Sequence, residues 1–191
     1  MNRLHARDAL TIKRIVRVNH AGEYGAIRIY SAQIAIARRL FPDAVPALQQ
    51  MLDDEVRHCD KFRAAMPSRG SRPCRVMQFW SLGGSLLGAA TALMGRNSIW
   101  VCTAAVEEAV HRHLDEQMAF LVNRDMELHE IIASIRDEEL AHLNHAEAQL
   151  ESAQSIKPHL RRAISVVTEI LIWLSTWGDS TRMSRALVAK S

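Results

Sequence analysis

The feature that most constrains this chain of 191 residues is a pattern of acids and histidines that occurs twice at a fixed interval. In each copy, a glutamate is followed 32 positions later by a Glu-x-x-His pair, and the two copies lie 84 positions apart. The members are Glu23, Glu55 and His58 in the first copy and Glu107, Glu139 and His142 in the second. Positions i and i+3 of a helix lie about 60° apart, so a carboxylate and an imidazole at this spacing can bind one cation. The repeat therefore predicts a duplicated helical hairpin whose four helices each carry part of one site.

This set of residues is the ligand set of carboxylate-bridged dinuclear metal sites in four-helix bundles. We expect Glu23 and His58 on one metal, Glu107 and His142 on the other, and Glu55 and Glu139 as bridges. Four carboxylates balance two divalent cations, and oxygen-rich ligation without thiolate suits iron or manganese better than structural zinc. A bundle without metal would have to bury four carboxylates on apolar stripes, at a cost of several kcal/mol each.

Composition agrees with a helical protein and excludes some function classes. The chain is 48% hydrophobic and has only two tyrosines, which favours one all-α domain over residues 1–191. Its net charge of +3 is too small to predict nucleic-acid binding, but it is compatible with an anionic membrane surface. Cys59, Cys74 and Cys102 form no C-x-x-C motif and indicate reduced thiols, and no secretory signal is visible.

Periodic apolar positions predict the order of the elements. We expect helices over residues 8–40, 43–66, 97–122 and 125–153, an apolar crossover helix over 76–95, a last apolar helix over 164–177 and a basic tail over 181–191. Asp43 and the Asn97-Ser98 pair are the expected N-caps of the helices over residues 43–66 and 97–122. The fold expected is a ferritin-like four-helix bundle with a crossover helix and an additional C-terminal helix.

The crossover stretch Val76–Gly95 has no formally charged residue and allows two interpretations. Twenty apolar residues can span a bilayer, but this stretch contains four glycines and several polar residues. We favour a helix that packs on the bundle or lies in the membrane interface, with Trp80 as an anchor. The cluster of Arg69, Arg72 and Arg75 precedes it and would lie at the headgroups.

Residues beside the expected ligands suggest further roles. Asp54 and Glu138 directly precede the bridging glutamates, and we expect each to accept a hydrogen bond from the histidine of the opposite hairpin. The alternative is that both are ordinary surface acids. Gly22 and Gly25 flank Glu23 and either make room for a substrate or let two helices approach closely.

Several histidines and one acid fall outside the repeat. Glu108 and His111 form a third Glu-x-x-His without a partner 84 positions away, so we interpret it as a surface or outer pair. The same reading as ordinary polar positions applies to His20, His113, His129 and His145.

Longer motifs around these residues resemble the demethoxyubiquinone hydroxylase family of coenzyme Q biosynthesis. They are NHAGEYGA at 19–26, DEVRH at 54–58, AVEE at 105–108, RDEELAH at 136–142 and the glycine-containing tract LLGAATALMG at 86–95. The resemblance spans nearly the whole chain, and the Asn-His-Ala-Gly-Glu opening is its most specific part. One departure is visible: members often have a His-Tyr pair after the third glutamate, whereas His113 precedes Leu114 here. A role for that tyrosine does not carry over.

The resemblance implies a di-iron monooxygenase that hydroxylates demethoxyubiquinol with O₂ in ubiquinone biosynthesis. It implies two iron ions, a polyprenyl quinone substrate and peripheral binding to the cytoplasmic face of a bacterial inner membrane or the matrix face of the mitochondrial one. Other coenzyme Q biosynthesis proteins or a second copy of the chain are possible partners. Since no G-x-G-x-x-G motif follows a strand, electrons would come from an external donor such as NADH or a reductase.

Two other function classes remain open at this point. An iron-oxidising storage bundle would share every ligand, and a metal-free helical scaffold on a membrane would use the same apolar faces.

Overall fold

The computed structural model describes residues 5–152 and 158–188, and these residues form seven α-helices, two short 3-10 helices and no strand. The α-helices are α1 (Ala6–Leu40), α2 (Val45–Ala65), α3 (Met77–Leu93), α4 (Arg96–Leu121), α5 (Met126–Ser152), α6 (Pro158–Ser175) and α7 (Asp179–Val188). The 3-10 helices are η1 (Pro42–Ala44) and η2 (Pro67–Arg69). The predicted all-α class is confirmed.

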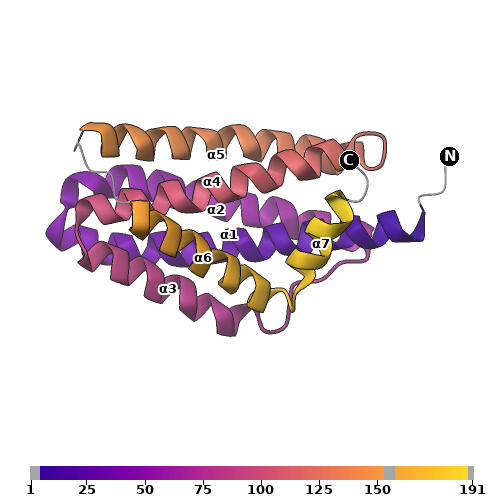
Figure 1. Ribbon diagram of the computed structural model, residues 1–191, viewed down its shortest axis with the longest axis horizontal. Coiled ribbons are helices and arrows are strands. Elements are labelled where there is room, and N and C mark those ends of the chain that lie inside the picture. Colours follow the sequence, from indigo (N-terminus) through magenta and orange to yellow (C-terminus); the bar gives the residue numbers. More distant parts are fainter. Residues whose placement is uncertain (1–4, 153–157, 189–191) are drawn as a thin grey trace.

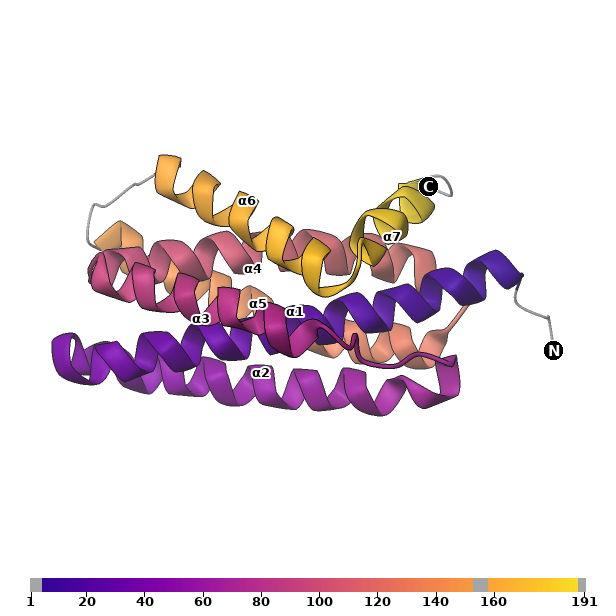
Figure 2. The ribbon, with the colours of Figure 1, turned by 90° about the horizontal axis from the view of Figure 1, so that it is seen from below.

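The bundle consists of two antiparallel hairpins, α1 with α2 and α4 with α5, which lie side by side along the long axis (Figures 1 and 2). Helix α3 connects the hairpins across the outside, and α6 lies beside α3 and over α4 (Figure 2). This is the predicted ferritin-like arrangement, with a long crossover between two copies of a hairpin.

Apolar side chains fill the bundle in two clusters along its length. One cluster includes Tyr30, Leu48 and Trp100, and the other includes Ile15 and Phe62. Glu23 lies between Ile15 and Tyr30 in the sequence, just as Glu55 lies between Leu48 and Phe62. The expected ligands therefore lie mid-bundle, with an apolar cluster on either side that keeps water away.

Helix α3 packs closely on α1 because two of its residues at the contact are glycines, which leave room for the backbone of α1. A Cβ atom on Gly84 would lie 2.9 Å from the carbonyl oxygen of Gly25, and one on Gly88 would lie 2.3 Å from that of Ile29. Within the described residues, none of the helices has the length and hydropathy needed to cross a bilayer. The side chain of Trp80, which we expected to act as an anchor, lies outside the described side chains.

The C-terminal part differs from the expectation of a basic tail. Residues 179–188 form the helix α7, whose Met183 and Leu187 are buried in the second apolar cluster. Asp179 is also buried, and its carboxylate accepts from Arg17 at 2.7 Å and from Arg14 at 3.3 Å. These pairs attach α7 to α1. Lys190 lies outside the described residues.

Both expected N-caps are wrong. Residue Asp43 lies in η1 rather than at the cap of α2, and its carboxylate pairs with Arg96 at 2.7 Å. Helix α4 begins at Arg96 after Gly95, whose φ of 113° is a conformation that glycine adopts without strain. Ser98 lies inside the first turn, where its hydroxyl donates to the carbonyl oxygen of Met94 at 3.4 Å.

The basic cluster before α3 is smaller than expected. The guanidinium of Arg69 is nearly buried and donates to both carboxylate oxygens of Asp125, at 2.7 and 2.8 Å. Because this bidentate pair ties η2 to the start of α5, Arg69 is not available to a membrane surface. Arg72 and Arg75 remain exposed.

Candidate metal centre

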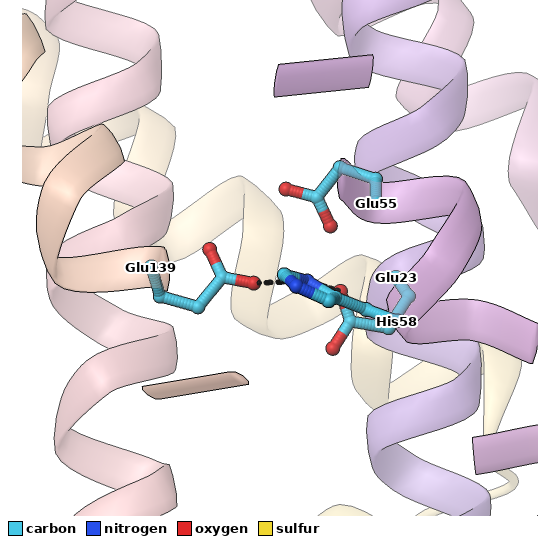
Figure 3. Close-up of side chains that lie close together, drawn as sticks. All are labelled: Glu23, Glu55, His58 and Glu139. Carbon is cyan, nitrogen blue, oxygen red and sulfur yellow. Dashed lines mark hydrogen bonds and ion pairs between the residues drawn. The ribbon is translucent and has the colours of Figure 1, made fainter. Parts of the chain in front are cut away.

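The six residues of the repeat meet in the middle of the bundle. Glu23 comes from α1, Glu55 and His58 from α2, Glu107 from α4, and Glu139 and His142 from α5, and all six are buried. Figure 3 shows Glu23, Glu55 and His58 pointing from one hairpin toward Glu139 of the other. The duplicated spacing thus brings one contribution from each bundle helix to a common centre.

Two groups of four potential ligands can be distinguished, and in each group the donor atoms lie within 4.8 Å of one another. The first group contains Glu23, Glu55, His58 and Glu139, and the second contains Glu55, Glu107, Glu139 and His142. The two residues that occur in both groups are Glu55 and Glu139, the pair that we expected to bridge two metals.

Both histidines turn their Nδ1 atoms toward the centre and their Nε2 atoms outward. His58 Nδ1 lies 2.9 Å from Glu139 Oε1, and His142 Nδ1 lies 3.4 Å from Glu139 Oε2. On the outer side, His142 Nε2 lies 3.0 Å from Asp54 Oδ2, and His58 Nε2 lies 3.2 Å from Glu138 Oε2. Each outer acid contacts the histidine of the opposite hairpin, in the crossed arrangement expected from the sequence. An acceptor at Nε2 fixes the tautomer that leaves the Nδ1 lone pair free for a cation.

Arg57 links the two outer acids. Its guanidinium pairs with Asp54 and, at 2.9 Å, with Glu138. Burial alone would raise the pKa of Asp54, but its bonds to His142 and Arg57 outweigh burial and leave that pKa below the ordinary range. The outer acids therefore stay ionised as acceptors for the imidazoles.

Burial and mutual repulsion strongly perturb the inner carboxylates. Burial, together with the neighbouring charge of Glu139, raises the pKa of Glu23 from 4.5 to about 7. The pKa values of Glu55 and Glu107 are also raised, by burial first and then by the Glu139 charge. Burial raises the pKa of Glu139 as well, but bonds to the two histidines outweigh it and lower that pKa overall. Four carboxyl groups buried this close together cannot all be ionised unless protons or cations lie between them.

The buried polar atoms without a hydrogen-bond partner indicate that cations, rather than protons alone, fit between these carboxylates. Both carboxylate oxygens of Glu55 are buried and have no hydrogen-bond partner among the described residues, and Oε2 of Glu139 and Nδ1 of His142 are buried with only their 3.4 Å contact to each other. All four atoms face the centre, and oxygen and imidazole nitrogen are the donors that iron or manganese takes. The residues present therefore fit two cations that share Glu55 and Glu139.

One polar contact to this centre was not predicted from the sequence. The Tyr30 hydroxyl donates to Glu107 Oε1 at 2.6 Å, and both residues are buried. Tyr30 lies seven positions after Glu23, which places it two turns along the same face of α1. That spacing was the available signal, but the partner on α4 depends on how the helices pack.

The third Glu-x-x-His lies apart from the centre. Glu108 is exposed and pairs with Arg161 at 3.0 Å, and His111 lies 3.7 Å from Asp115. Neither belongs to the two ligand groups found among the described residues.

The remaining histidines have other surroundings. Nε2 of His113 lies 3.0 Å from a Glu169 carboxylate oxygen, and the ring of His145 packs edge-on against Trp100. His20 is buried, His129 is half-buried, and burial lowers the pKa of His20.

A cavity of about 440 Å³ opens beside the centre. Four expected ligands, Glu23, Glu55, Glu107 and Glu139, line it, together with other residues of α1 and α4 and with residues of α3, α6 and α7. Gly22 and Gly25 also line it, and a Cβ atom on either would meet nothing within 4 Å. Open space beside these glycines agrees with room for a ligand, whereas Gly84 and Gly88 provide the close helix approach.

The chain matches a known protein family over most of its length. The profile of the family described as "Ubiquinone biosynthesis protein COQ7" matches residues 10–175. The chain belongs to this family. The resemblance to demethoxyubiquinone hydroxylases noted in the sequence is thereby confirmed.

Curated members of the COQ7 family are similar over most of the chain. A mouse protein named "NADPH-dependent 3-demethoxyubiquinone 3-hydroxylase, mitochondrial" is 40% identical over 172 residues, which cover 86% of this chain and 76% of the relative. A Rhodospirillum rubrum protein named "3-demethoxyubiquinol 3-hydroxylase" is 35% identical over 167 residues, covering 87% and 78%. A Saccharomyces cerevisiae protein named "5-demethoxyubiquinone hydroxylase, mitochondrial" is 29% identical over 183 residues, again covering 87% and 78%. The COQ7 match ends before α7.

Proposed function

We propose that the chain is a di-iron monooxygenase that hydroxylates the ring of demethoxyubiquinol in ubiquinone biosynthesis. The observation that carries the proposal is one mainly apolar cavity that leads directly onto four of the six buried metal-ligand candidates. The names of the relatives supply the substrate class. In the overall reaction, one atom of O₂ enters a ring C–H bond, and the other leaves as water with two electrons and two protons from a donor.

The proposed ligands divide as the repeat suggests. Glu23 and His58 would hold one iron, Glu107 and His142 would hold the other, and both irons would share Glu55 and Glu139. The two groups of donor atoms and the unpartnered atoms of Glu55 support this assignment. When bound, the iron pair supplies O₂ activation, a chemistry that protein side chains cannot perform alone.

The chain's own residues orient the ligands and tune their charge. Asp54 and Glu138 hold the outer N–H of each imidazole, and Arg57 balances the two acids. Tyr30 fixes one oxygen of Glu107 through its short hydrogen bond. Such outer partners typically change metal affinity about 10- to 100-fold when removed.

The cavity excludes water and receives an apolar substrate. The wall around Gly22 and Gly25 is open beside Glu23, so a planar ring can approach the carboxylates there. Toward the outside, Gly84 of α3 and Trp173 of α6 line the same cavity. A polyprenyl tail leaving between these helices would avoid crossing water, whose cost is about 0.8 kcal/mol for each exposed CH₂ group.

An exposed apolar surface on α3 and α6 supports binding to a membrane. It is formed by side chains that are each more than 40% exposed, namely Leu82, Leu86, Leu93, Val166, Val167, Ile170 and Trp173. Helices α3 and α6 contact each other and lie on the same side of the bundle (Figure 2). We propose that this surface lies in the interface of an anionic membrane, with Arg72 and Arg75 at the headgroups. Either the cytoplasmic face of a bacterial inner membrane or the matrix face of a mitochondrial one fits this role.

The electrons would come from an external nicotinamide donor, either directly or through a reductase. The term "NADPH-dependent" in the mouse relative's name supports this source. The alternative of an iron-storing bundle explains the ligands, but it gives no reason for a large apolar cavity beside them.

One incubation tests the proposed function. Iron-loaded protein is mixed with demethoxyubiquinone, reductant and O₂, and the products are analysed by mass spectrometry. The expected product carries one additional oxygen atom, which becomes heavy when ¹⁸O₂ is used. Iron-dependent O₂ consumption without a hydroxylated quinone would instead support ferritin-like iron oxidation. A metal-free preparation and the Glu139→Ala variant are the controls, and neither should give product.

A further inference from the structure

Two buried amide side chains face each other at one end of the cavity. Asn19 of α1 is 8% exposed and Gln117 of α4 is 0% exposed, and both line the cavity. Asn19 Nδ2 donates to Gln117 Oε1 at 2.7 Å, and Gln117 Nε2 donates to Asn19 Oδ1 at 3.0 Å. They therefore form a reciprocal pair in a space that is otherwise mainly apolar.

The reciprocal pair does not use the full bonding capacity of the amides. Each amide carries two N–H donors and an oxygen with two lone pairs, and the pair uses one donor and one lone pair of each. Gln117 Nε2 also lies 3.8 Å from the Met183 sulfur, which is only a weak acceptor. Donors and acceptors therefore remain unused on two residues that line the cavity.

The position of the pair relative to the carboxylates suggests what that ligand group is. Asn19 lies four residues before Glu23, so the two side chains share a face of α1 about 6 Å apart along its axis. A substituted ring that presents one carbon to the carboxylates would place ring oxygens at this distance. Along α1, Asn19 is thus about one ring diameter from Glu23.

We infer that Asn19 and Gln117 bind the ring oxygens of the quinone and so select an oxygenated ring over other apolar molecules. This inference rests on the proposed function, because it assigns specificity to the same cavity. An amide suits both redox forms of the ring: its N–H donates to a quinone carbonyl, and its oxygen accepts from a quinol hydroxyl. A charged group would favour one of these forms and would cost more to bury.

A buried amide pair could instead serve only to tie α1 to α4, and the chain contains a matched control for that role. Gln33 is also 0% exposed, and its amide donates to the Thr91 hydroxyl at 3.2 Å, which ties α1 to α3. Gln33 is not among the described residues that line the cavity. The same substitution at Gln33 and Gln117 therefore separates loss of a helix contact from loss of a ring contact.

The test compares the double variant Asn19→Leu/Gln117→Met with Gln33→Met and wild type. Leucine keeps the branched skeleton of asparagine, methionine is close to glutamine in length and volume, and together the two changes leave no unpaired buried amide. Each iron-loaded protein is titrated without O₂ with a short-chain demethoxyubiquinone and with an alkylbenzene of the same tail. Binding is followed by fluorescence, since Trp173 lines the cavity. Iron content and Tm are measured in parallel.

The expected result is a change in selectivity. The double variant should bind the quinone roughly 10-fold more weakly, as expected for losing one or two neutral hydrogen bonds, and should bind the alkylbenzene as before. Its KM should rise while its iron content stays unchanged, and Gln33→Met should bind both ligands like wild type.

Two results would overturn the inference. Unchanged quinone affinity in the double variant would show that the amides do not contact the ring. An equal loss of affinity for both ligands would show that the pair only shapes the cavity. The proposed function itself would fail in a different way, through a wild-type protein that gives no hydroxylated product. If the wild type forms product and the double variant still prefers the quinone, the ring contact is refuted but the proposed function is not.

Discussion

Removing the metals should make the stability of this protein depend steeply on pH. The reason is Glu23, whose pKa rises on folding from 4.5 to about 7 because the carboxyl is buried and lies near the Glu139 charge. A group with a raised folded-state pKa contributes stability that is fully present below its unfolded pKa and is lost as the pH rises through the folded value. The free energy of unfolding of the metal-free protein should therefore fall by about 3 kcal/mol between pH 4.5 and 7 from this group alone.

Neighbouring groups act in the same direction over this window. Burial, followed by repulsion from Glu139, raises the pKa values of Glu55 and Glu107, so both favour the metal-free fold at lower pH. Burial alone would lower the pKa values of His58 and His142, but their bonds to Glu139 outweigh burial and raise them above 6.5. Stability gained from their protonated forms is lost as the pH rises above 6.5, which steepens the same decline.

Groups with lowered pKa values act outside the window. Glu139 and Asp54 have folded-state pKa values below their ordinary ranges, since hydrogen bonds outweigh the effect of burial. Their contribution is complete above the unfolded pKa, about 4 for a carboxyl, and is lost only as the pH falls below that value. They therefore do not cancel the decline between pH 4.5 and 7.

Urea unfolding in the presence of a chelator, followed by circular dichroism at several pH values, measures this dependence. Glu23→Gln should remove a large part of the slope, whereas Glu108→Gln at an exposed position should leave it unchanged. Loading with metal should flatten the slope, because cations take the place of the protons. A metal-free protein whose unfolding free energy is constant or rises from pH 4.5 to 7 would refute the reasoning.

Three further predictions test the ligands, the cavity wall and the outer acids. Glu55→Ala should lower the content of both metals, because it is proposed to bridge them, whereas Glu108→Ala should retain two; metal analysis distinguishes these outcomes. Gly25→Leu should abolish quinone turnover with iron content and Tm close to wild type, because its Cβ points into open space. By contrast, Gly88→Ala should cost about 1–3 kcal/mol of stability through overpacking against α1. If thermal unfolding shows that Gly25→Leu is less stable than Gly88→Ala, Gly25 does not border open space. Asp54→Asn should weaken metal binding about 10- to 100-fold in a competition titration, and unchanged affinity would exclude a role in holding the imidazole.

The buried cluster was predictable because its chemistry limits where such residues can lie. A glutamate on an apolar helical stripe, such as Glu23 or Glu107, is buried, and its charge must be balanced by nearby groups. The repeat of the pattern after 84 residues identifies those groups. The crossed contacts of Asp54 and Glu138 followed from the same phase. Helix positions were also predictable, because the apolar periodicity of each bundle helix runs over many turns.

Features that depend on packing between distant segments were not predictable. Whether Asp43 caps a helix depends on a backbone turn that one residue does not determine, and the chain inserts η1 there. The bond between Tyr30 and Glu107 requires the register of α1 against α4. The basic residues after Thr181 led to the prediction of a tail in place of α7. Met183 and Leu187, however, are spaced four residues apart, as on one face of a helix.

The crossed contacts between outer acids and histidines have a consequence for how the two halves of the chain depend on each other. Asp54 of the first hairpin contacts His142 of the second, and Glu138 of the second contacts His58 of the first. Neither hairpin alone can orient its own imidazole, so a half-chain would complete the arrangement only by pairing with another hairpin. Because α3 joins the two hairpins in one chain, their association does not depend on protein concentration.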